Sequence, residues 1–339
     1  MAMKNTNPDR ATVGIYGCTN RYTLDRPATE KATFGVTLIG AALGLGAVDP
    51  SCSEGPRILR KHCPELMMLN QGIQVDWDDI LRPDQQKTND VIATIGAFCL
   101  QLAERVKKTI SRGRRFVVIG GDHSCAIGTW SGATTAIADK GPLGLVWIDA
   151  HLDAHTPETS PSGYVHGMPV ASLLGYGRPL LTDLLRPGPK LLPQHLCLIG
   201  GRCYEQEELN LLDKLGVRLI LMEEVRKLGF AAALNKAVNI ATSGTAGFGI
   251  SIDLDAIHSD DAPAVCTPAP GGIPATQLIS SIAGLDTGQK LIGYEIAEFN
   301  PCLDNGGRTA RLICDLLVAM VVKDPRNDNT LIPLNTSVS

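Results

Sequence analysis

The sequence contains no pair of cysteines separated by two residues, although it has ten cysteines among 339 residues. This absence argues against a zinc ribbon and against a C-x-x-C redox site, because both need closely spaced thiols. We expect most of these cysteines to be reduced thiols in the core of a cytoplasmic protein.

An excess of charge of one sign is also lacking. The formal net charge is -4 and the pI is about 6.0, so neither a nucleic acid nor an anionic membrane is predicted as a partner. The first residues lack the apolar segment of a signal peptide. The apolar run that starts at Phe34 is too short and too rich in glycine to span a bilayer, and it is interpreted as a strand and a loop.

A dinucleotide-binding loop is not indicated either. The glycines of GAALGLG, which starts at Gly40, do not have the G-x-G-x-x-G spacing, and no acidic residue closes a second strand at the expected distance. We therefore interpret them as turn glycines.

What the sequence does contain is an alternation of apolar β-prone runs with helical patterns. This alternation predicts an α/β fold, with a parallel sheet covered by helices on both faces. The predicted strands are VTLIGA, RFVVIGG, GLVWIDA, LCLIGG, RLILME, GFGISIDLDA and KLIGYEIAEF.

The clearest predicted helix has apolar residues at steps of three and four, from Val91 to Val106. Other helices are predicted for GPRILRKH, EQEELNLLDKLG and TARLICDLLVAMVV. Without repeats or a clear linker, we predict a single domain over residues 33–325. Residues 1–32 are predicted to form an extension or irregular lead-in, and residues 326–339 a C-terminal tail.

Acidic residues and histidines follow several of these strands. Because the carboxyl ends of parallel strands meet at one edge of a sheet, we expect these side chains to converge. Buried together, the carboxylates would repel one another unless a cation lay among them; the alternative for each alone is a loop acid facing water or a hydrogen-bonded histidine. A carboxylate-rich set with two imidazoles suits two Mn²⁺ ions, with Ni²⁺, Co²⁺ or Fe²⁺ as alternatives. The set is His123, Asp149, His151, Asp153, Asp253 and Asp255.

Several motifs, in this order along the chain, resemble the ureohydrolases and among them the arginase family. They are EGPRILR, GGDHS, DAHLDAHTPETSPSGYVHG, SIDLDAIHSDDAPAVCTPAPGG and EFNP. The loop from Asp149 to His166 has the length found in arginases without a gap, which favours arginase over the agmatinase branch, whose corresponding loop looks different. The resemblance implies a three-layer α/β/α fold around a mainly parallel eight-stranded sheet. It also implies a homo-oligomer, most often a trimer or hexamer.

The resemblance further implies roles for individual residues. The six residues named above would bind two Mn²⁺ ions. On chemical grounds, Asp153 would also take a proton during catalysis, and either Asp153 or His166 would protonate the leaving amine. His166 would shuttle protons near the substrate, and Glu298 would hold the guanidinium group. Glu205, in IGGRCYEQEE, would help to hold the substrate α-amino group.

Some positions differ from the family pattern. Arginases commonly have two asparagines that meet the substrate α-carboxylate; here these positions are His155 and Tyr164, while Ser162 is kept. Both replacements can donate a hydrogen bond, but with a different reach. In the third motif, His258 and Cys266 also depart from the usual pattern. These differences concern the substrate tail and leave the metal chemistry intact.

The leading hypothesis is an arginase-like hydrolase acting on C–N bonds in linear amidines. A hydroxide that bridges two Mn²⁺ ions would attack the guanidinium carbon of L-arginine and yield urea and L-ornithine. One alternative is a ureohydrolase for another guanidino compound, namely a guanidino acid, agmatine or guanidine, which His155 and Tyr164 motivate. A second is a non-catalytic metal-binding or assembly protein, against which the complete ligand set and His166 argue.

Overall fold

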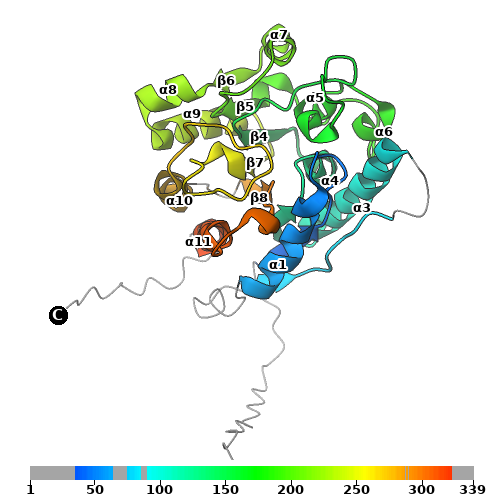
Figure 1. Cartoon of the computed structure of the whole chain (residues 1–339). Coiled ribbons are helices and arrows are strands. Elements are labelled where there is room, and N and C mark those ends of the chain that lie inside the picture. Colours follow the sequence, from blue (N-terminus) through cyan, green and yellow to red (C-terminus); the bar gives the residue numbers. More distant parts are fainter. Residues whose placement is uncertain (1–34, 64–74, 85–89, 287, 289, 323–339) are drawn as a thin grey trace, which may run out of the picture. The chain divides into compact units, whose positions relative to one another are not determined.

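A parallel β-sheet organises the protein. The computed structural model describes residues 35–63, 75–84, 90–286, 288 and 290–322. Within them, eight strands form one sheet in the order β2-β1-β3-β8-β7-β4-β5-β6, and every pairing is parallel (Figure 1). The strands are β1 (Val36–Ala41), β2 (Val75–Trp77), β3 (Arg115–Gly120), β4 (Leu143–Ile148), β5 (Leu196–Ile199), β6 (Arg218–Ile220), β7 (Gly247–Asp253) and β8 (Leu291–Ala297).

Seven of these strands coincide with the predicted apolar runs, but β2 was not predicted. Its sequence, VDW, offers no continuous apolar run, and it pairs with β1 at the edge of the sheet. The pairing of Val75 with Val36 is a long-range contact. A local pattern of three residues cannot indicate it.

The helices found in the described residues include the four that the sequence predicted, now α1, α3, α7 and α11. Short 3₁₀ helices connect many elements: η1 (Pro50–Glu54), η2 (Val165–Gly167), η3 (Pro193–His195), η4 (Leu254–Ala256) and η5 (Pro301–Leu303). The α-helices are α1 (Gly55–His62), α3 (Val91–Ser111), α4 (Cys125–Ile137), α5 (Pro169–Leu173), α6 (Pro179–Thr182), α7 (Gln206–Leu215), α8 (Met222–Leu228), α9 (Phe230–Thr242), α10 (Ala275–Gly284) and α11 (Arg308–Val322).

Helix α3 shows how the sequence determines a helix. Asp90 accepts hydrogen bonds from the backbone N–H groups of Ile92 and Ala93, which satisfies donors that the first turn leaves free. The periodic residues Phe98 and Leu102 are buried. Helix α4 has no such period, because almost all of its residues are buried between α3 and the sheet. For that reason its pattern did not predict a helix.

Two hydrophobic clusters cover the two faces of the sheet. Along β3, Val117 and Ile119 belong to one cluster, whereas Phe116 and Val118 belong to the other. Alternate residues of a strand point to opposite faces, so both faces of the sheet are buried. The first cluster includes residues of α1, α9, α10 and α11, and the second residues of α3, α4 and α7. This arrangement is the expected three-layer α/β/α fold (Figure 1).

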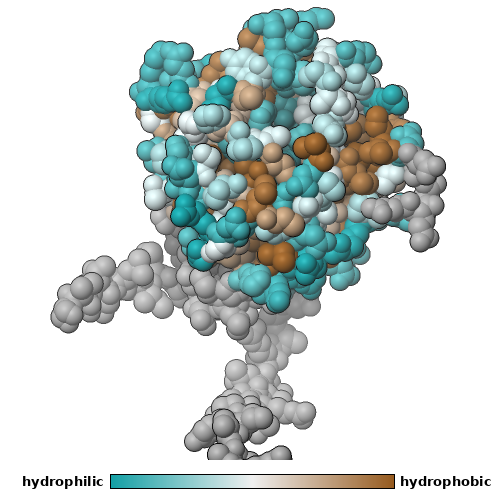
Figure 2. Space-filling model, viewed as in Figure 1, coloured by the Kyte–Doolittle hydropathy of each residue, from teal (hydrophilic) through white to brown (hydrophobic). Residues whose placement is uncertain are grey.

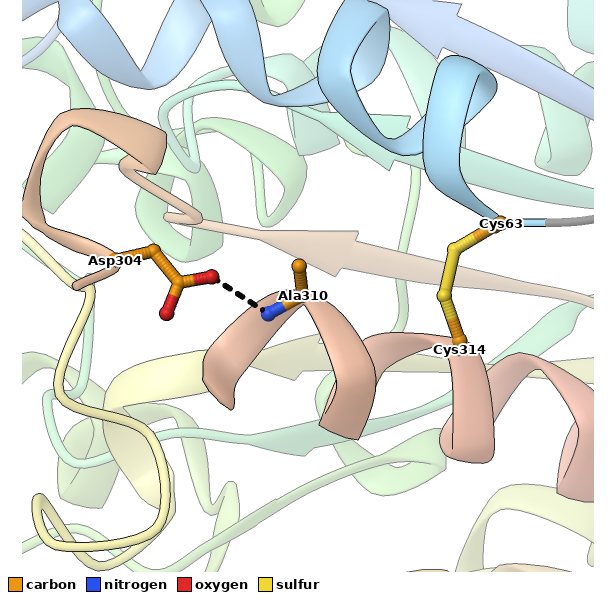
Figure 3. The surroundings of a disulfide bond; sticks show 4 residues. All are labelled: Cys63, Asp304, Ala310 and Cys314. Carbon is orange, nitrogen blue, oxygen red and sulfur yellow. Dashed lines mark hydrogen bonds between the residues drawn. A yellow bond between two sulfur atoms is a disulfide. The ribbon is translucent and has the colours of Figure 1, made fainter. Parts of the chain in front are cut away.

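The cysteine prediction needs one correction. Cys63, which follows α1, forms a disulfide with Cys314 of α11, with a Cα–Cα distance of 5.5 Å (Figure 3). Disulfide partners 251 residues apart cannot be deduced from spacing alone. At the start of α11, Asp304 accepts a hydrogen bond from the Ala310 N–H (Figure 3). Most of the remaining described cysteines are free and buried, as predicted: Cys52, Cys99, Cys125 and Cys197.

The surface is mixed in polarity. Figure 2 shows a mainly hydrophilic face with a hydrophobic patch where α5, α6 and the start of α3 lie in Figure 1. Leu180 of α6 and Val91 of α3 are about half exposed. None of the helices in the described residues combines the length and the apolar character needed to cross a membrane. The predicted terminal segments, residues 1–32 and 326–339, lie outside the described residues.

Candidate active site

Most of the predicted site residues lie at the carboxyl ends of four neighbouring strands, β3, β8, β7 and β4, whereas Glu205 follows β5. His123 follows β3, Asp149 follows β4, Asp253 ends β7 and Glu298 follows β8. Because every strand is parallel, these strand ends occupy one rim of the sheet. The topology thus brings together residues that are far apart in the sequence.

Five side chains on this rim form two groups that share Asp149. One group contains His123, Asp149 and Asp253; the other contains Asp149, His151 and Asp255. Within each group, the candidate ligand atoms lie within 4.8 Å of one another. Each group could hold one cation, and the Asp149 carboxylate would then lie between two adjacent cations.

His123 is the residue around which three carboxylates gather. Its Nδ1 lies 3.2 Å from Asp149 Oδ2 and 3.1 Å from both Asp153 Oδ2 and Asp253 Oδ2. In the other group, His151 Nδ1 lies 3.0 Å from Asp255 Oδ2. Asp153 adopts a left-handed backbone with φ of 50°, which is uncommon for a residue other than glycine.

The other ring nitrogen of His123 is fixed by a hydrogen-bond chain. Nε2 lies 3.0 Å from the Ser251 hydroxyl, which in turn donates to Glu295 Oε2 at 2.9 Å. Since the Ser251 proton is used on Glu295, its oxygen accepts from His123 Nε2. The Nδ1 lone pair of the neutral ring then faces the three carboxylates.

This arrangement fits divalent cations. His123 Nδ1 and Asp153 Oδ2 are buried and have no hydrogen-bond partner. A lone pair and several carboxylate oxygens repel one another in a buried site unless positive charge lies among them. The donors are oxygen and imidazole nitrogen without thiolate, which suits Mn²⁺ and related ions and disfavours softer metals.

Electrostatics point the same way, because protons must replace cations in the metal-free chain. Burial lowers the pKa of His123, but the carboxylates of Asp149, Asp153 and Asp253 outweigh burial and hold that pKa well above its usual value. Burial and the charges of Asp255 and Asp149 raise the pKa of Asp253. Burial and Asp149 raise the pKa of Asp153 to about 7.

Glu298 and His166 form a second part of the site. Glu298 Oε1 lies 3.2 Å from His166 Nδ1 and accepts a hydrogen bond from the backbone N–H of His123 at 2.8 Å. Its other oxygen, Oε2, is buried and has no hydrogen-bond partner. Glu298 also has a left-handed backbone, with φ of 69°, and its N–H donates to the Gly121 carbonyl. A buried carboxylate oxygen without a partner is suited to receive a cationic group.

The glycine-rich segment from Gly40 supports this part of the site. The Gly46 N–H donates to the Asp122 carboxylate at 2.8 Å, and the Gly46 carbonyl accepts from the His166 N–H. At Gly121, a Cβ atom would lie 1.8 Å from the Leu43 carbonyl oxygen. Glycine at position 121 therefore allows the glycine-rich segment from Gly40 to pack directly against GGDHS. The sequence did not indicate this contact.

The residues predicted to contact the substrate tail are only partly brought together. His155 is buried, and its Nε2 lies 3.1 Å from Glu205 Oε2 and 3.5 Å from Glu208 Oε2. Ser162 and Tyr164 are exposed on the same loop, and Tyr164 makes an edge contact with the His166 ring.

Sequence reasoning missed Glu208. This buried residue accepts hydrogen bonds from the N–H groups of Ala154 and Glu205, and so links α7 to the loop. Its position one turn after Glu205 at a helix start is the signal of a capping box, which the sequence displayed.

Comparison with known proteins gives a consistent result. Residues 34–322 match the family model described as the arginase family. The chain is 38% identical over 291 residues to the arginase of Bacillus caldovelox, an alignment that covers 83% of this chain and 96% of that protein. It is 30% identical to human arginase-1 over 81% of this chain and 87% of that protein.

Solved structures are similar as well. The arginase of Bacillus cereus superposes with a TM-score of 0.79 at 31% identity, covering 85% of this chain and 98% of that one. The Entamoeba histolytica arginase solved with L-ornithine superposes with a TM-score of 0.76 at 26% identity, covering 85% and 99%. The chain therefore belongs to the arginase family and is an arginase-like hydrolase that acts on carbon–nitrogen bonds of linear amidines.

Proposed function

We propose that this protein hydrolyses L-arginine to urea and L-ornithine with two Mn²⁺ ions bound at the rim of the sheet. The observation that carries the proposal is the pair of donor groups sharing Asp149, with the unpartnered Glu298 Oε2 on the neighbouring strand end. The Entamoeba histolytica arginase solved with L-ornithine, the expected product, supports the substrate.

The six rim residues would hold the metal ions: His123, Asp149, His151, Asp153, Asp253 and Asp255. Two ions bound there would make water a strong nucleophile at neutral pH. Glu298 orients the substrate, because its free oxygen accepts from the guanidinium N–H groups and balances their charge.

Two residues handle protons. Asp153, whose Oδ2 has no hydrogen-bond partner, accepts the proton released as water attacks the guanidinium carbon. His166 is held against Glu298 and is partly exposed, so it carries a proton between the solvent and the leaving amine. Protonation of that amine allows the C–N bond to break.

A ureohydrolase for another guanidino compound is the second candidate. The observation in its favour is the His155 contact with Glu205, because this contact occupies the residue predicted to hold the substrate α-amino group. A substrate without that group, such as a guanidino acid without an amine or guanidine itself, would not need Glu205.

A substrate panel separates the two candidates. Protein reconstituted separately with Mn²⁺, Ni²⁺ and Co²⁺ is assayed for urea release from L-arginine, agmatine, a guanidino acid and guanidine. We expect L-arginine with Mn²⁺ to give the highest kcat/KM. Absence of urea from L-arginine in a protein with metal bound would reject the substrate assignment, and the Asp149→Asn variant serves as the inactive control.

The predicted trimer or hexamer and the cytoplasmic location belong to the same proposal. The hydrophobic patch over α6 and the start of α3 is the surface on which a second copy would be sought. Light scattering of the purified protein measures the oligomeric state directly.

A further inference from the structure

Two thiols lie beside Glu298, outside the carboxylate set of the rim. Cys52 belongs to η1 and is fully buried, and Cys266 lies in the loop after β7 and is half-buried. The two sulfur atoms and one carboxylate oxygen of Glu298 lie within 4.8 Å of one another. Three potential ligand atoms from distant parts of the chain therefore meet at one place.

Backbone and side-chain contacts hold the two thiols in this position. Cys52 Sγ lies 3.5 Å and Cys266 Sγ 3.8 Å from the same acceptor, the Asp49 carbonyl oxygen. Asn300 Nδ2 donates to Cys266 Sγ at 3.3 Å and to Asp49 Oδ2 at 2.8 Å. A hydrogen bond between the thiols raises the pKa of Cys52, with burial adding to it, and lowers the pKa of Cys266.

Glu298 contributes an independent observation. The side chain is 1% exposed, and its Oε1 is occupied by the His123 N–H and by His166. Its Oε2 has no hydrogen-bond partner. A buried carboxylate with one free oxygen, close to two thiols, calls for a positively charged ligand.

The chemistry of the three donors selects the kind of ion. Thiolates are soft ligands and bind Zn²⁺ and similar ions, in contrast to the rim, which has no thiolate. Three protein ligands leave one position of a tetrahedral Zn²⁺ open to water. Two sulfurs bound to one such ion are about 3.8 Å apart, so small side-chain rotations suffice.

We propose that Cys52, Cys266 and Glu298 form a binding site for one thiophilic divalent cation such as Zn²⁺, and that an ion there inhibits turnover. The ion takes the Glu298 oxygen that the guanidinium group would use, a consequence that rests on the proposed function. Binding displaces the two thiol protons to solvent, so the affinity for the ion rises with pH.

The first test measures binding without any substrate. The Mn²⁺-loaded protein is titrated with Cd²⁺ under argon, and thiolate-to-metal charge-transfer absorption is recorded, a signal that the oxygen and nitrogen ligands of the rim do not give. We expect one equivalent to saturate the wild type and the Cys302→Ser control, which lacks an exposed thiol. We expect Cys266→Ser and Cys52→Ser/Cys266→Ser to bind at least about tenfold more weakly.

An unchanged absorption in the double variant, or a Cys52–Cys266 disulfide found by peptide mapping of the unreduced protein, would overturn the site. The Cys266→Ser variant keeps the buried Cys52, so it still tests the site if the double variant does not fold. A thermal melt of each variant verifies that it is folded. Because no substrate is used, this result does not depend on arginine hydrolysis.

The second test measures inhibition. Zn²⁺ should compete with L-arginine, and half-inhibition of Cys266→Ser should need at least about tenfold more Zn²⁺ than half-inhibition of the wild type. Equal inhibition of both proteins would place the Zn²⁺ effect at the rim and reject the inhibitory role. Retained Cd²⁺ binding in a protein that turns over no L-arginine would instead count against the proposed function alone.

Discussion

Trp147 lies nearly parallel to the ring of His123, with ring centroids 4.1 Å apart and an interplanar angle of 16°. Its indole Nε1 also donates to Asp149 Oδ2 at 2.9 Å. One buried side chain of β4 therefore fixes two of the proposed metal ligands, one by stacking and one by a hydrogen bond. Such supporting contacts orient ligands and tune their affinity for metal.

Replacing Trp147 with phenylalanine tests this support. The change keeps an aromatic ring against His123 but removes the hydrogen bond to Asp149, and we expect Mn²⁺ affinity to fall by about tenfold. Mn²⁺ titration followed by electron paramagnetic resonance measures the affinity. Trp77→Phe is the matched control, because Trp77 Nε1 has no hydrogen-bond partner and lies on the edge strand β2. Equal Mn²⁺ affinity in both variants would contradict the role of Trp147.

Replacing His155 with asparagine tests the substrate tail. His155 Nε2 contacts Glu205 Oε2, and removing the imidazole frees Glu205 to meet the substrate α-amino group. We expect KM for L-arginine to fall by about fivefold, near 1 kcal/mol, while kcat changes little. Steady-state kinetics with L-arginine and with a guanidino acid that lacks the amino group measure the effect. The guanidino acid has no amine for Glu205 to bind, so an equal gain for both substrates would show that the imidazole does not act through Glu205.

The pH dependence of stability tests the His166–Glu298 contact. Burial lowers the pKa of His166, but the hydrogen bond and charge of Glu298 outweigh burial and raise that pKa from 6.5 to about 9 in the metal-free chain. A basic group whose pKa is higher in the folded state than in the unfolded state stabilises the folded protein. This contribution is complete at a pH below the pKa of the group in the unfolded state, and it is lost as the pH rises through the pKa of the group in the folded state.

We therefore expect the stability gap between wild type and His166→Asn to be largest near pH 6 and to shrink by about 2–3 kcal/mol toward pH 10. Urea unfolding of the chelator-treated proteins at pH values from about 6 to about 10 measures the unfolding free energy of each. When Glu298 is replaced with glutamine in both proteins, the gap between their unfolding free energies should be small at every pH. A gap that stays constant or widens with pH would rule out this contact as the source.

Local patterns predicted much of the fold. The long apolar strands and the periodic helices α1, α3, α7 and α11 are specified by contiguous residues, and they were predicted. Strand β2 and helix α4 are among the elements that were not predicted, because one depends on a distant partner and the other is buried on all sides. The helices α5, α6, α8, α9 and α10 were not predicted either. Boundaries were good to a few residues at α11, which extends from Arg308 to Val322.

The site was predictable to a different degree. The rim residues follow strand ends, so parallel topology alone predicts their convergence. The meeting of Cys52 with Cys266 depends on how loops pack, and no spacing in the sequence indicates it. The role of Gly121 likewise needs the position of the Leu43 carbonyl. Residues fixed by loop-to-loop contacts thus required the three-dimensional structure.

The disulfide between Cys63 and Cys314 yields the last prediction. It joins α1 to α11 across 251 residues, and such a cross-link restricts the unfolded chain strongly. We expect the Cys63→Ser/Cys314→Ser variant to lose about 2–5 kcal/mol of unfolding free energy without loss of kcat for L-arginine at ambient temperature. Thermal unfolding with and without a reductant measures this loss. Reductant should lower the Tm of the wild type and of the Cys302→Ser control, which retains the bond, but not that of the double variant. A wild-type Tm that does not respond to reductant would show that the two thiols are not joined in solution.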